Sequence, residues 1–210
     1  MLFVKQAYHH KDLRNALIDE ALAILASGDA GQITLRELAR RLGVTHSAPY
    51  AHFPDKRALL EAVEAAGFTR LTELLREAGR PEHDPARRFV AQALAYVQFA
   101  RDNANLYRLM FADRELAHDP QCDWSPEGDQ AFQIVLDDLS ALGLPEGTDI
   151  RDAACGAWAT LHGIAMLEID GRLQGKIAIP GKAATPNGDA IVLLMCNFLL
   201  RGLRAATSGS

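Results

Sequence analysis

Cysteine is scarce in this 210-residue chain, and the three that occur lie far apart. Cys122, Cys155 and Cys196 form no Cys-x-x-Cys pair, so we expect neither a disulfide framework nor a cysteine-ligated zinc site. We interpret all three as small core residues. A chain of this length can bury a substantial apolar core without disulfides or metals.

Long apolar runs are also missing. No stretch approaches the roughly 18 residues that cross a membrane, and the first residues, MLFVKQAYHHKDLR, become polar too early for a secretory signal. The hydrophobic fraction of 49% and the charged fraction of 23% are ordinary for a globular protein. We therefore expect a cytoplasmic protein without a membrane-spanning segment.

Catalytic signatures are missing as well. The sequence contains no Gly-rich phosphate loop, no His-Glu-x-x-His, no nucleophile elbow and no Cys–His cluster with metal spacing. Asp137 and Asp138 are adjacent in a predicted helix and point apart, which is poor geometry for acid–base chemistry. We expect no enzyme activity, no cofactor and no metal.

The net charge of −5 is unevenly distributed along the chain. Residues 1–57 hold eight Lys or Arg against six Asp or Glu, and the other 153 residues hold 14 against 21. A mildly basic N-terminal module on an acidic body could direct the basic end toward phosphates. Sampling noise accounts for the same numbers equally well.

The helical pattern is what the sequence does have. Alternating β-branched strands are absent, and Ala-, Leu-, Arg- and Glu-rich runs are separated by Gly, Pro and Asp, which predicts an all-α fold. The predicted helices cover residues 11–27, 35–42, 45–52, 57–79, 84–101, 104–112, 127–142, 150–172 and 188–205. The long loops expected at 113–128 and 174–188 have lengths that are often functional or mobile.

Residues 34–52 have the pattern of a helix-turn-helix unit. Thr34 is a predicted N-cap, Glu37 completes a capping box, and Gly43 supplies the turn after an amphipathic helix. In such a unit the second helix enters the DNA major groove with its first residues at the base edges. The LRELARRLG pattern alone is equally compatible with an ordinary helix that faces the core.

Small polar side chains occupy the leading end of the predicted second helix. Thr45, His46 and Ser47 are suited to base edges or phosphates, and the methyl group of Ala48 to a thymine methyl. Further along, Tyr50, His52 and Lys56 are suited to phosphate oxygens. The alternative is that Tyr50 is an aromatic residue of the core and His52 is a surface histidine without a DNA contact.

Pro49 is harmless if Ser47 caps this helix, because it then falls at the second helical position. It costs one hydrogen bond if Thr45 is the cap. The sequence leaves both possibilities open.

The stretch ITLRELARRLGVTHSAPYAHFPDKRALLEAV closely resembles the DNA-binding domain of TetR-family transcriptional regulators. YHHKDLRNALIDEALAIL resembles the first helix of that family, and AWATLHGIAMLEIDG resembles the Trp…His-Gly signature of one class of its C-terminal domains. The resemblance implies an all-helical homodimer whose three N-terminal helices bind DNA. It places Thr34, Tyr50, His52 and Lys56 at phosphates and Thr45, His46 and Ser47 at bases. We include Arg36 with the DNA-contacting residues. Ala51 departs from the larger, often basic residue of relatives.

On this basis we expect a DNA-binding domain over residues 1–56 and an effector-binding and dimerisation domain over 57–210. The predicted effector site collects aromatic and sulfur-containing side chains and one histidine: Tyr96, Phe99, Tyr107, Met110, Phe111, Trp124, Trp158, His162 and Met166. The alternative is that these residues form ordinary core. Helices 150–172 and 188–205 are predicted to make the dimer interface, with internal core as the alternative.

The functional expectation follows from these parts. We expect a ligand-responsive transcriptional regulator, a repressor by family likeness, that binds a palindromic operator as a homodimer and is released by a small apolar effector. The alternative is a helical small-molecule-binding or interaction protein that has lost DNA recognition, for which Ala51 is the only hint.

Overall fold

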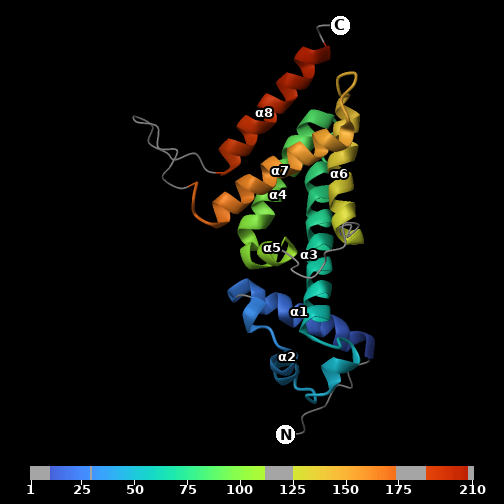
Figure 1. The fold of residues 1–210 in the computed structure, drawn as a ribbon, viewed down its shortest axis with the longest axis vertical. Coiled ribbons are helices and arrows are strands. Elements are labelled where there is room, and N and C mark those ends of the chain that lie inside the picture. Colours follow the sequence, from blue (N-terminus) through green and yellow to red (C-terminus); the bar gives the residue numbers. More distant parts are fainter. Residues whose placement is uncertain (1–9, 29, 112–124, 174–187, 208–210) are drawn as a thin grey trace. The chain divides into compact units, whose positions relative to one another are not determined.

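The computed structural model describes residues 10–28, 30–111, 125–173 and 188–207. These residues form eight α-helices and two 3-10 helices and contain no strand (Figure 1), so the predicted all-α fold is confirmed. In chain order the elements are α1 (His10–Ser27), η1 (Ala30–Gln32), α2 (Leu35–Leu42), η2 (Ala48–Ala51), α3 (Lys56–Gly79), α4 (Pro85–Asp102), α5 (Ala104–Met110), α6 (Pro126–Leu142), α7 (Ile150–Ile169) and α8 (Gly188–Thr207).

Most of the predicted helices occur with ends close to those expected. Helix α7 stops at Ile169 instead of 172, because Gly171 adopts a left-handed backbone with a φ of 65°. Helix α6 begins inside the stretch expected to be a loop: the Ser125 hydroxyl oxygen accepts the N–H of Gly128 at 3.2 Å and caps it. Residues 113–124 and 174–187 of the two predicted long loops lie outside the described residues, and Gly188 begins α8.

The prediction of a regular helix over residues 45–52 is wrong. The chain forms a turn after Thr45 and then the four-residue 3-10 helix η2, whose N-cap is Ser47. Pro49 is therefore its second residue, which selects the harmless one of the two positions left open by the sequence. A proline at this position is compatible with an α-helix, so the contacts of η2 with α1 and α2 decide the conformation of so short a segment.

The N-terminal compact unit comprises the described residues up to 67 together with 105–111. Helices α1 and α2 contact each other, and both contact η2. The predicted apolar face of α1 is buried throughout, and fully buried side chains of α2, α3 and the segment before α2 complete this core: Ile33, Leu38, Leu59 and Val63. Asn105 at the start of α5 donates its side-chain N–H to the carbonyl of Leu25 at 3.0 Å, so a segment from far along the chain joins this unit.

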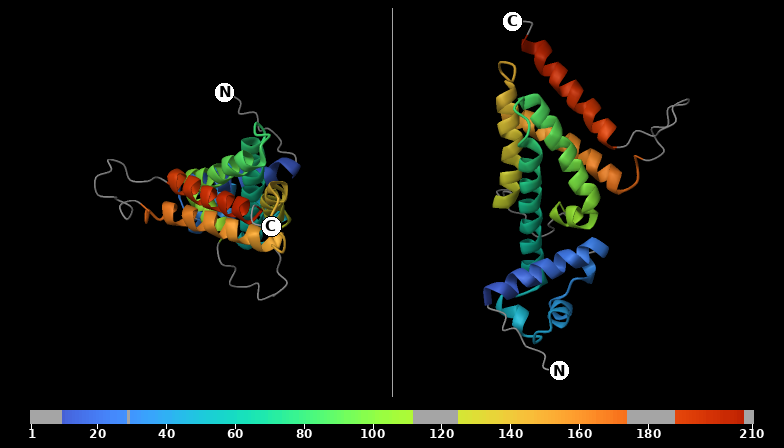
Figure 2. Two further views of the ribbon diagram at one scale, coloured as in Figure 1. Left: turned by 90° about the horizontal axis from the view of Figure 1, so that it is seen from above. Right: turned by 180° about the vertical axis from the view of Figure 1, so that it is seen from behind.

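The C-terminal compact unit comprises residues 68–104 and the described residues from 125 onward. Helix α4 packs against α6, α7 and α8, and α7 contacts both α6 and α8 (Figure 2). Val97, Leu139, Ala154, Ala165 and Val192 are fully buried between these helices. The predicted domain boundary between residues 56 and 57 remains a prediction, because compactness does not show which unit binds DNA and which binds an effector.

The cysteine interpretation holds in part. Cys196 is buried, as expected, and Cys122 lies outside the described residues. Cys155 is exposed, which contradicts its assignment to the core. It lies one helical turn from exposed Asp152 and Ala159, on the side of α7 that faces outward. Among the described helices, none is both long and apolar enough to cross a membrane.

Candidate DNA interface and ligand pockets

Helix α2 is fixed at both ends by local backbone chemistry. The Thr34 hydroxyl oxygen accepts the N–H of Glu37 at 3.1 Å, which confirms the predicted N-cap. At the other end Gly43 has a φ of 67°, and the N–H of Val44 donates to the carbonyl of Ala39 at 3.0 Å. These caps set the length of α2 and the direction in which the chain leaves it.

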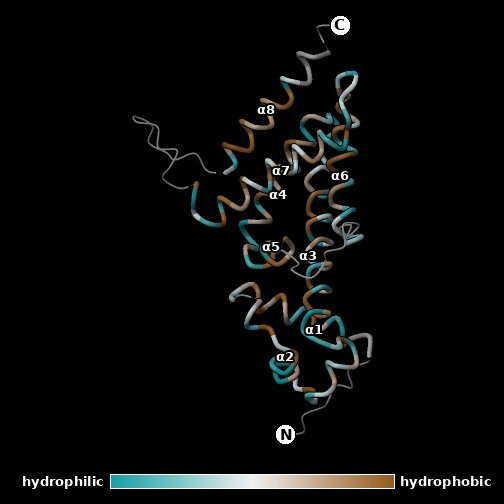
Figure 3. The backbone as a smooth tube through the Cα atoms, in the orientation of Figure 1, coloured by the Kyte–Doolittle hydropathy of each residue, from teal (hydrophilic) through white to brown (hydrophobic). Residues whose placement is uncertain are grey.

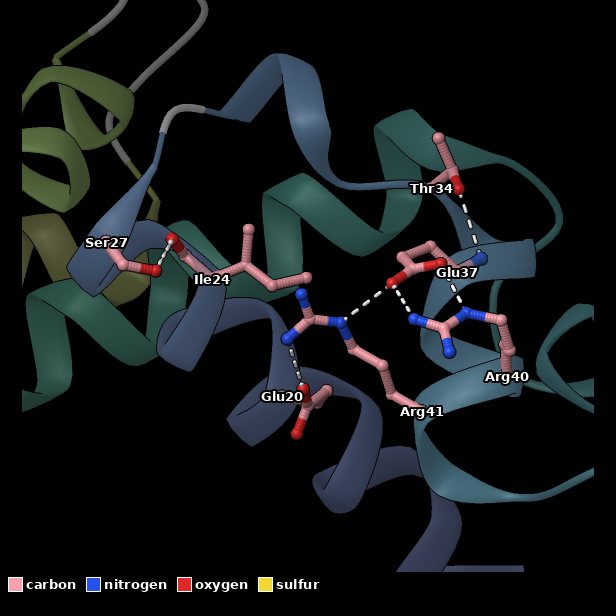
Figure 4. A network of polar contacts seen from close by, with 7 residues as sticks. All are labelled: Glu20, Ile24, Ser27, Thr34, Glu37, Arg40 and Arg41. Atoms are coloured by element: carbon pink, nitrogen blue, oxygen red, sulfur yellow. Dashed lines mark hydrogen bonds and ion pairs between the residues drawn. The ribbon is translucent and has the colours of Figure 1, made fainter.

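The Glu37 side chain does not complete the predicted capping box. Its carboxylate accepts from Arg40 Nη2 at 2.6 Å and from Arg41 Nε at 2.9 Å, and Arg41 Nη1 also reaches Glu20 Oε1 at 3.0 Å (Figure 4). The hydrogen bonds from Arg40 and then Arg41 lower the pKa of Glu37 to about 2. The network thus occupies two of the arginines that make the N-terminal region basic, and it ties α2 to α1.

Arg36 stays outside this network. Its side chain is exposed and forms no ion pair within the described part of the chain. Lys56 is half-buried at the start of α3 and donates to the carbonyl of Gly31 at 3.3 Å. Arg36 is therefore the better placed of the two to give a mobile positive charge to a phosphate.

The segment after Gly43 presents its side chains to solvent. Thr45, His46 and Ser47 are all exposed, and the hydroxyl oxygens of Thr45 and Ser47 lie 3.3 Å apart. The backbone is held by an N–H of Ala48 that donates to the Thr45 carbonyl at 3.0 Å. Three exposed polar side chains therefore lie at the leading edge of η2, where they are accessible for base contact.

Burial of Pro49 anchors η2 while its neighbour points outward. Pro49 is buried, and its carbonyl accepts the N–H groups of His52 and Phe53, each at 3.0 Å. Phe53 is 2% exposed under the guanidinium of Arg14, which lies 5.2 Å from the ring centroid. Tyr50 in contrast is 49% exposed, so its hydroxyl is accessible to a partner. The structure leaves Ala48 and His52 half-buried.

The predicted effector residues separate into two groups. Tyr107 and Met110 are buried in the N-terminal unit, where the Tyr107 and Phe111 rings lie 4.7 Å apart. In the C-terminal unit, Trp158 Nε1 donates to the Tyr96 hydroxyl at 3.2 Å, and the Trp158 and His162 rings lie 5.6 Å apart. Burial lowers the pKa of His162.

The remaining three residues of that set add little to either group. Phe99 is buried on α4, Met166 is half-buried on α7, and Trp124 lies outside the described residues. Ligand binding by the set stays a prediction.

An apolar groove that the sequence did not indicate lies between α4, α7 and α8. Its volume is about 340 Å³, within the range of small-molecule sites. None of the predicted effector residues lines it; its walls include Phe89, Leu161, Met195, Cys196 and Phe198. Helical spacing alone could not reveal it, because the groove depends on how three helices separated along the chain come together.

The fold and the exposed edge define a class: helix-turn-helix proteins with a separate all-helical C-terminal unit. Two family models match, one described as bacterial regulatory proteins of the tetR family over residues 17–63 and one as a tetracyclin repressor-like C-terminal domain over residues 89–183. The nucleoid occlusion factor SlmA of Marinobacter nauticus is 31% identical over 77% of this chain and 82% of its own length. The chain belongs to the TetR family of transcription regulators.

Two further likenesses extend this result. The SlmA protein of a Marinomonas species is 30% identical, but the match covers 49% of this chain and only 52% of that relative. A solved structure of a protein with unknown function from Rhodococcus sp. RHA1 is 34% identical, covers 95% of this chain and 99% of that one, and superimposes with a TM-score of 0.77. The architecture described above therefore extends over almost the whole of a solved relative.

Proposed function

We propose that the protein is a transcriptional repressor that binds a palindromic operator as a homodimer and releases it when a small apolar effector binds. The observation that carries the proposal is the exposed polar edge of residues 45–47, presented by a turn that the buried Pro49 anchors. A rigid support holds exposed polar side chains at fixed positions, which is what hydrogen bonding to base edges needs.

We assign contacts to exposed side chains and to the half-buried Ala48, His52 and Lys56. Thr45, His46 and Ser47 face bases, and the methyl of Ala48 adds an apolar contact. Phosphates are met by the Tyr50 hydroxyl, by Thr34 and Arg36 at the start of α2, and by His52 and Lys56. The phosphate contacts set the position of the unit on the duplex, and the edge supplies the sequence preference.

The outward face of α7 and α8 supports homodimerisation. Leu167, Leu193, Leu194 and Phe198 are between 42% and 59% exposed, which is unusual for large apolar side chains, and the apolar residues of α8 are visible in Figure 3. A β-carbon added at Gly156 or Gly163 would meet no atom within 4 Å, so a second helix could approach closely there. A two-fold symmetric pair would cover this face and present two reading edges to the two halves of a palindrome.

The groove between α4, α7 and α8 offers a route from effector to DNA. Met195 and Phe198 line the groove and are also exposed on α8, so the same side chains would serve the ligand and the dimer contact. An apolar molecule that moves them would change how the two copies meet, without touching the reading edge. Coupling of this kind is typically about 1–3 kcal/mol, or about 5- to 150-fold in operator affinity.

A selection of genomic fragments on the immobilised protein, followed by binding titrations, tests the DNA assignment. Ser47→Ala should change the preferred bases with little general loss, and Tyr50→Phe should weaken every site equally. Affinity should fall with salt at a log–log slope of about −0.9 per neutralised phosphate. Retention of no fragment would instead favour a binding protein that has lost DNA recognition.

Charge substitutions on α8 test the dimer. Leu194→Glu together with Phe198→Glu should give monomers in sedimentation experiments and weaken operator binding, whereas Arg87→Glu on the exposed side of α4 should leave the dimer intact. A wild-type chain that sediments as a monomer at concentrations that saturate the operator would contradict the homodimer.

The likeness to SlmA supports nucleoid occlusion as a second candidate role. Nucleoid occlusion and transcriptional repression both require the protein to bind DNA. The same fragment selection separates them: sites beside a few promoters favour a repressor, and many sites spread over the chromosome favour nucleoid occlusion.

A further inference from the structure

A second, polar pocket lies in the C-terminal unit, away from every residue assigned above. It is formed by the end of α3, the following loop, the first half of α4 and the middle of α6, and its volume is about 640 Å³. That volume falls within the range of sites for small organic molecules. The pocket shares no lining residue with the apolar groove, and none with the DNA interface.

Asp138 is the most deeply buried charged residue of this pocket, with an exposed fraction of 2%. Its Oδ1 accepts from Arg88 Nε at 2.6 Å, which ties α6 to α4. Its Oδ2 is shielded from solvent and has no hydrogen-bond donor among the described residues. One half of the carboxylate is thus satisfied, and the other half lacks the donor that a buried oxygen requires.

Gln92 brings a second acceptor in the same condition. Its side chain is 8% exposed, and its Oε1 also has no donor in the described part of the chain. Gly79 leaves the space for it: a β-carbon there would lie 2.5 Å from Gln92 Nε2 and 3.0 Å from Arg88 Cγ. Because residue 79 has no side chain, the end of α3 comes close to Gln92 and Arg88.

We infer that this pocket binds a small molecule through a protonated amine, with Asp138 Oδ2 and Gln92 Oε1 accepting its N–H groups. Both deep unsatisfied atoms are acceptors, so the missing group is a donor. An ammonium group provides up to three N–H donors together with the positive charge that a carboxylate favours. A carboxylate or phosphate ligand would leave both acceptors unsatisfied.

Three arginines and three acidic side chains line the pocket, so their formal charges cancel, and the unsatisfied oxygen of Asp138 is what favours a cation at its deep end. Burial raises the pKa of Asp138, whereas the hydrogen bond from Arg88 opposes this shift. A bound ammonium would add a second positive charge and keep the carboxylate ionised. Because both acceptors are shielded from solvent, entry of the ligand requires a shift of lining side chains.

Isothermal titration of the full chain with butan-1-amine, benzylamine and butyrate at pH 7 tests the inference. We expect saturable binding of at least one amine and none of butyrate, which matches butan-1-amine in length and has the opposite charge. Asp138→Asn should weaken amine binding about tenfold or more, because a hydrogen bond between charged groups is lost. Asp129→Asn is the matched control: this carboxylate lies on the same helix, is exposed and does not line the pocket, so its loss should change binding less than about twofold.

Gln92→Met gives an independent second test. It removes the other acceptor at similar volume and keeps the pair between Arg88 and Asp138, so it decides the matter if Asp138→Asn does not fold. Binding of no amine at millimolar concentration would mean that water alone satisfies the two acceptors, and would overturn the inference. Equal binding by wild type and the folded variants, or binding of butyrate in place of the amines, would overturn it too. DNA binding plays no part in these measurements, so their outcome is separate from that of the proposed function.

Discussion

Replacement of Thr34 by aspartate separates the two roles assigned to the start of α2. The Thr34 hydroxyl oxygen accepts the Glu37 N–H at 3.1 Å, and aspartate is at least as good an N-cap as threonine. Its negative charge is also favourable at a helix N-terminus. We therefore expect the free energy of unfolding of Thr34→Asp to equal that of the wild type within about 0.5 kcal/mol.

Operator binding should respond in the opposite way. The aspartate removes a hydroxyl donor and puts a carboxylate where a phosphate is expected. A hydrogen bond to a charged group contributes about 1.5–3 kcal/mol, so even the lower figure gives about a tenfold loss for each half-site. A dimer that uses both half-sites would lose about a hundredfold, before any repulsion between the two negative charges is added.

Urea unfolding and fluorescence anisotropy with a selected operator measure the two quantities on the same preparation. Thr34→Ser should keep both functions. Thr34→Ala should lose about 1 kcal/mol of stability along with its phosphate contact. If Thr34→Asp is as stable as the wild type and also binds DNA equally well, Thr34 is only a helix cap and the phosphate assignment fails.

Three further predictions concern the interior. Leu38→Ala should lower the free energy of unfolding by about 2–5 kcal/mol in urea titrations, because Leu38 is fully buried. Leu74 is 37% exposed, so Leu74→Ala should lower it much less. Equal losses for the two variants would contradict the described core. Burial lowers the pKa of His162, so the unfolded chain binds a proton at a higher pH than the folded chain does. The free energy of unfolding should therefore fall as the pH drops below 6.5. His162→Gln should reduce this pH dependence, as measured by urea midpoints between pH 7.5 and 5.5. Burial raises the pKa of the Cys196 thiol to about 11, so iodoacetamide at pH 8 should modify it only after denaturation, as read by mass spectrometry; rapid modification of the native protein would show that the site opens readily.

Local chemistry was predictable from the sequence where neighbours along the chain decide it. The Thr34 cap, the Gly43 turn and the buried face of α1 all depend on residues within two helical turns. The conformation of η2 was missed, although Pro49 was recognised, because tertiary contacts from α1 and α2 decide how a segment that short settles. Glu37 was assigned to the capping box because two competing arginines on α2 were not weighed against a single backbone N–H.

Contacts between residues far apart along the chain could not be predicted from the sequence. The Arg88–Asp138 pair joins residues 50 positions apart, and no spacing rule connects them. The sequence predicted that Asp137 and Asp138 point apart; one is exposed and the other is buried, but both line the same pocket. It gave no sign of which side would be the interior or that a pocket would form there. The groove between α4, α7 and α8 was not predicted either, because it also depends on contacts between helices far apart along the chain.

The anchoring of η2 by Pro49 has a consequence for how such a protein can diversify. Pro49 is buried in the N-terminal unit, whereas Thr45, His46 and Ser47 are all exposed. Randomised libraries at those three positions should therefore yield mostly well-folded variants with altered operator preference. Evolution could retarget the protein to new genes by the same route, with few compensating changes elsewhere.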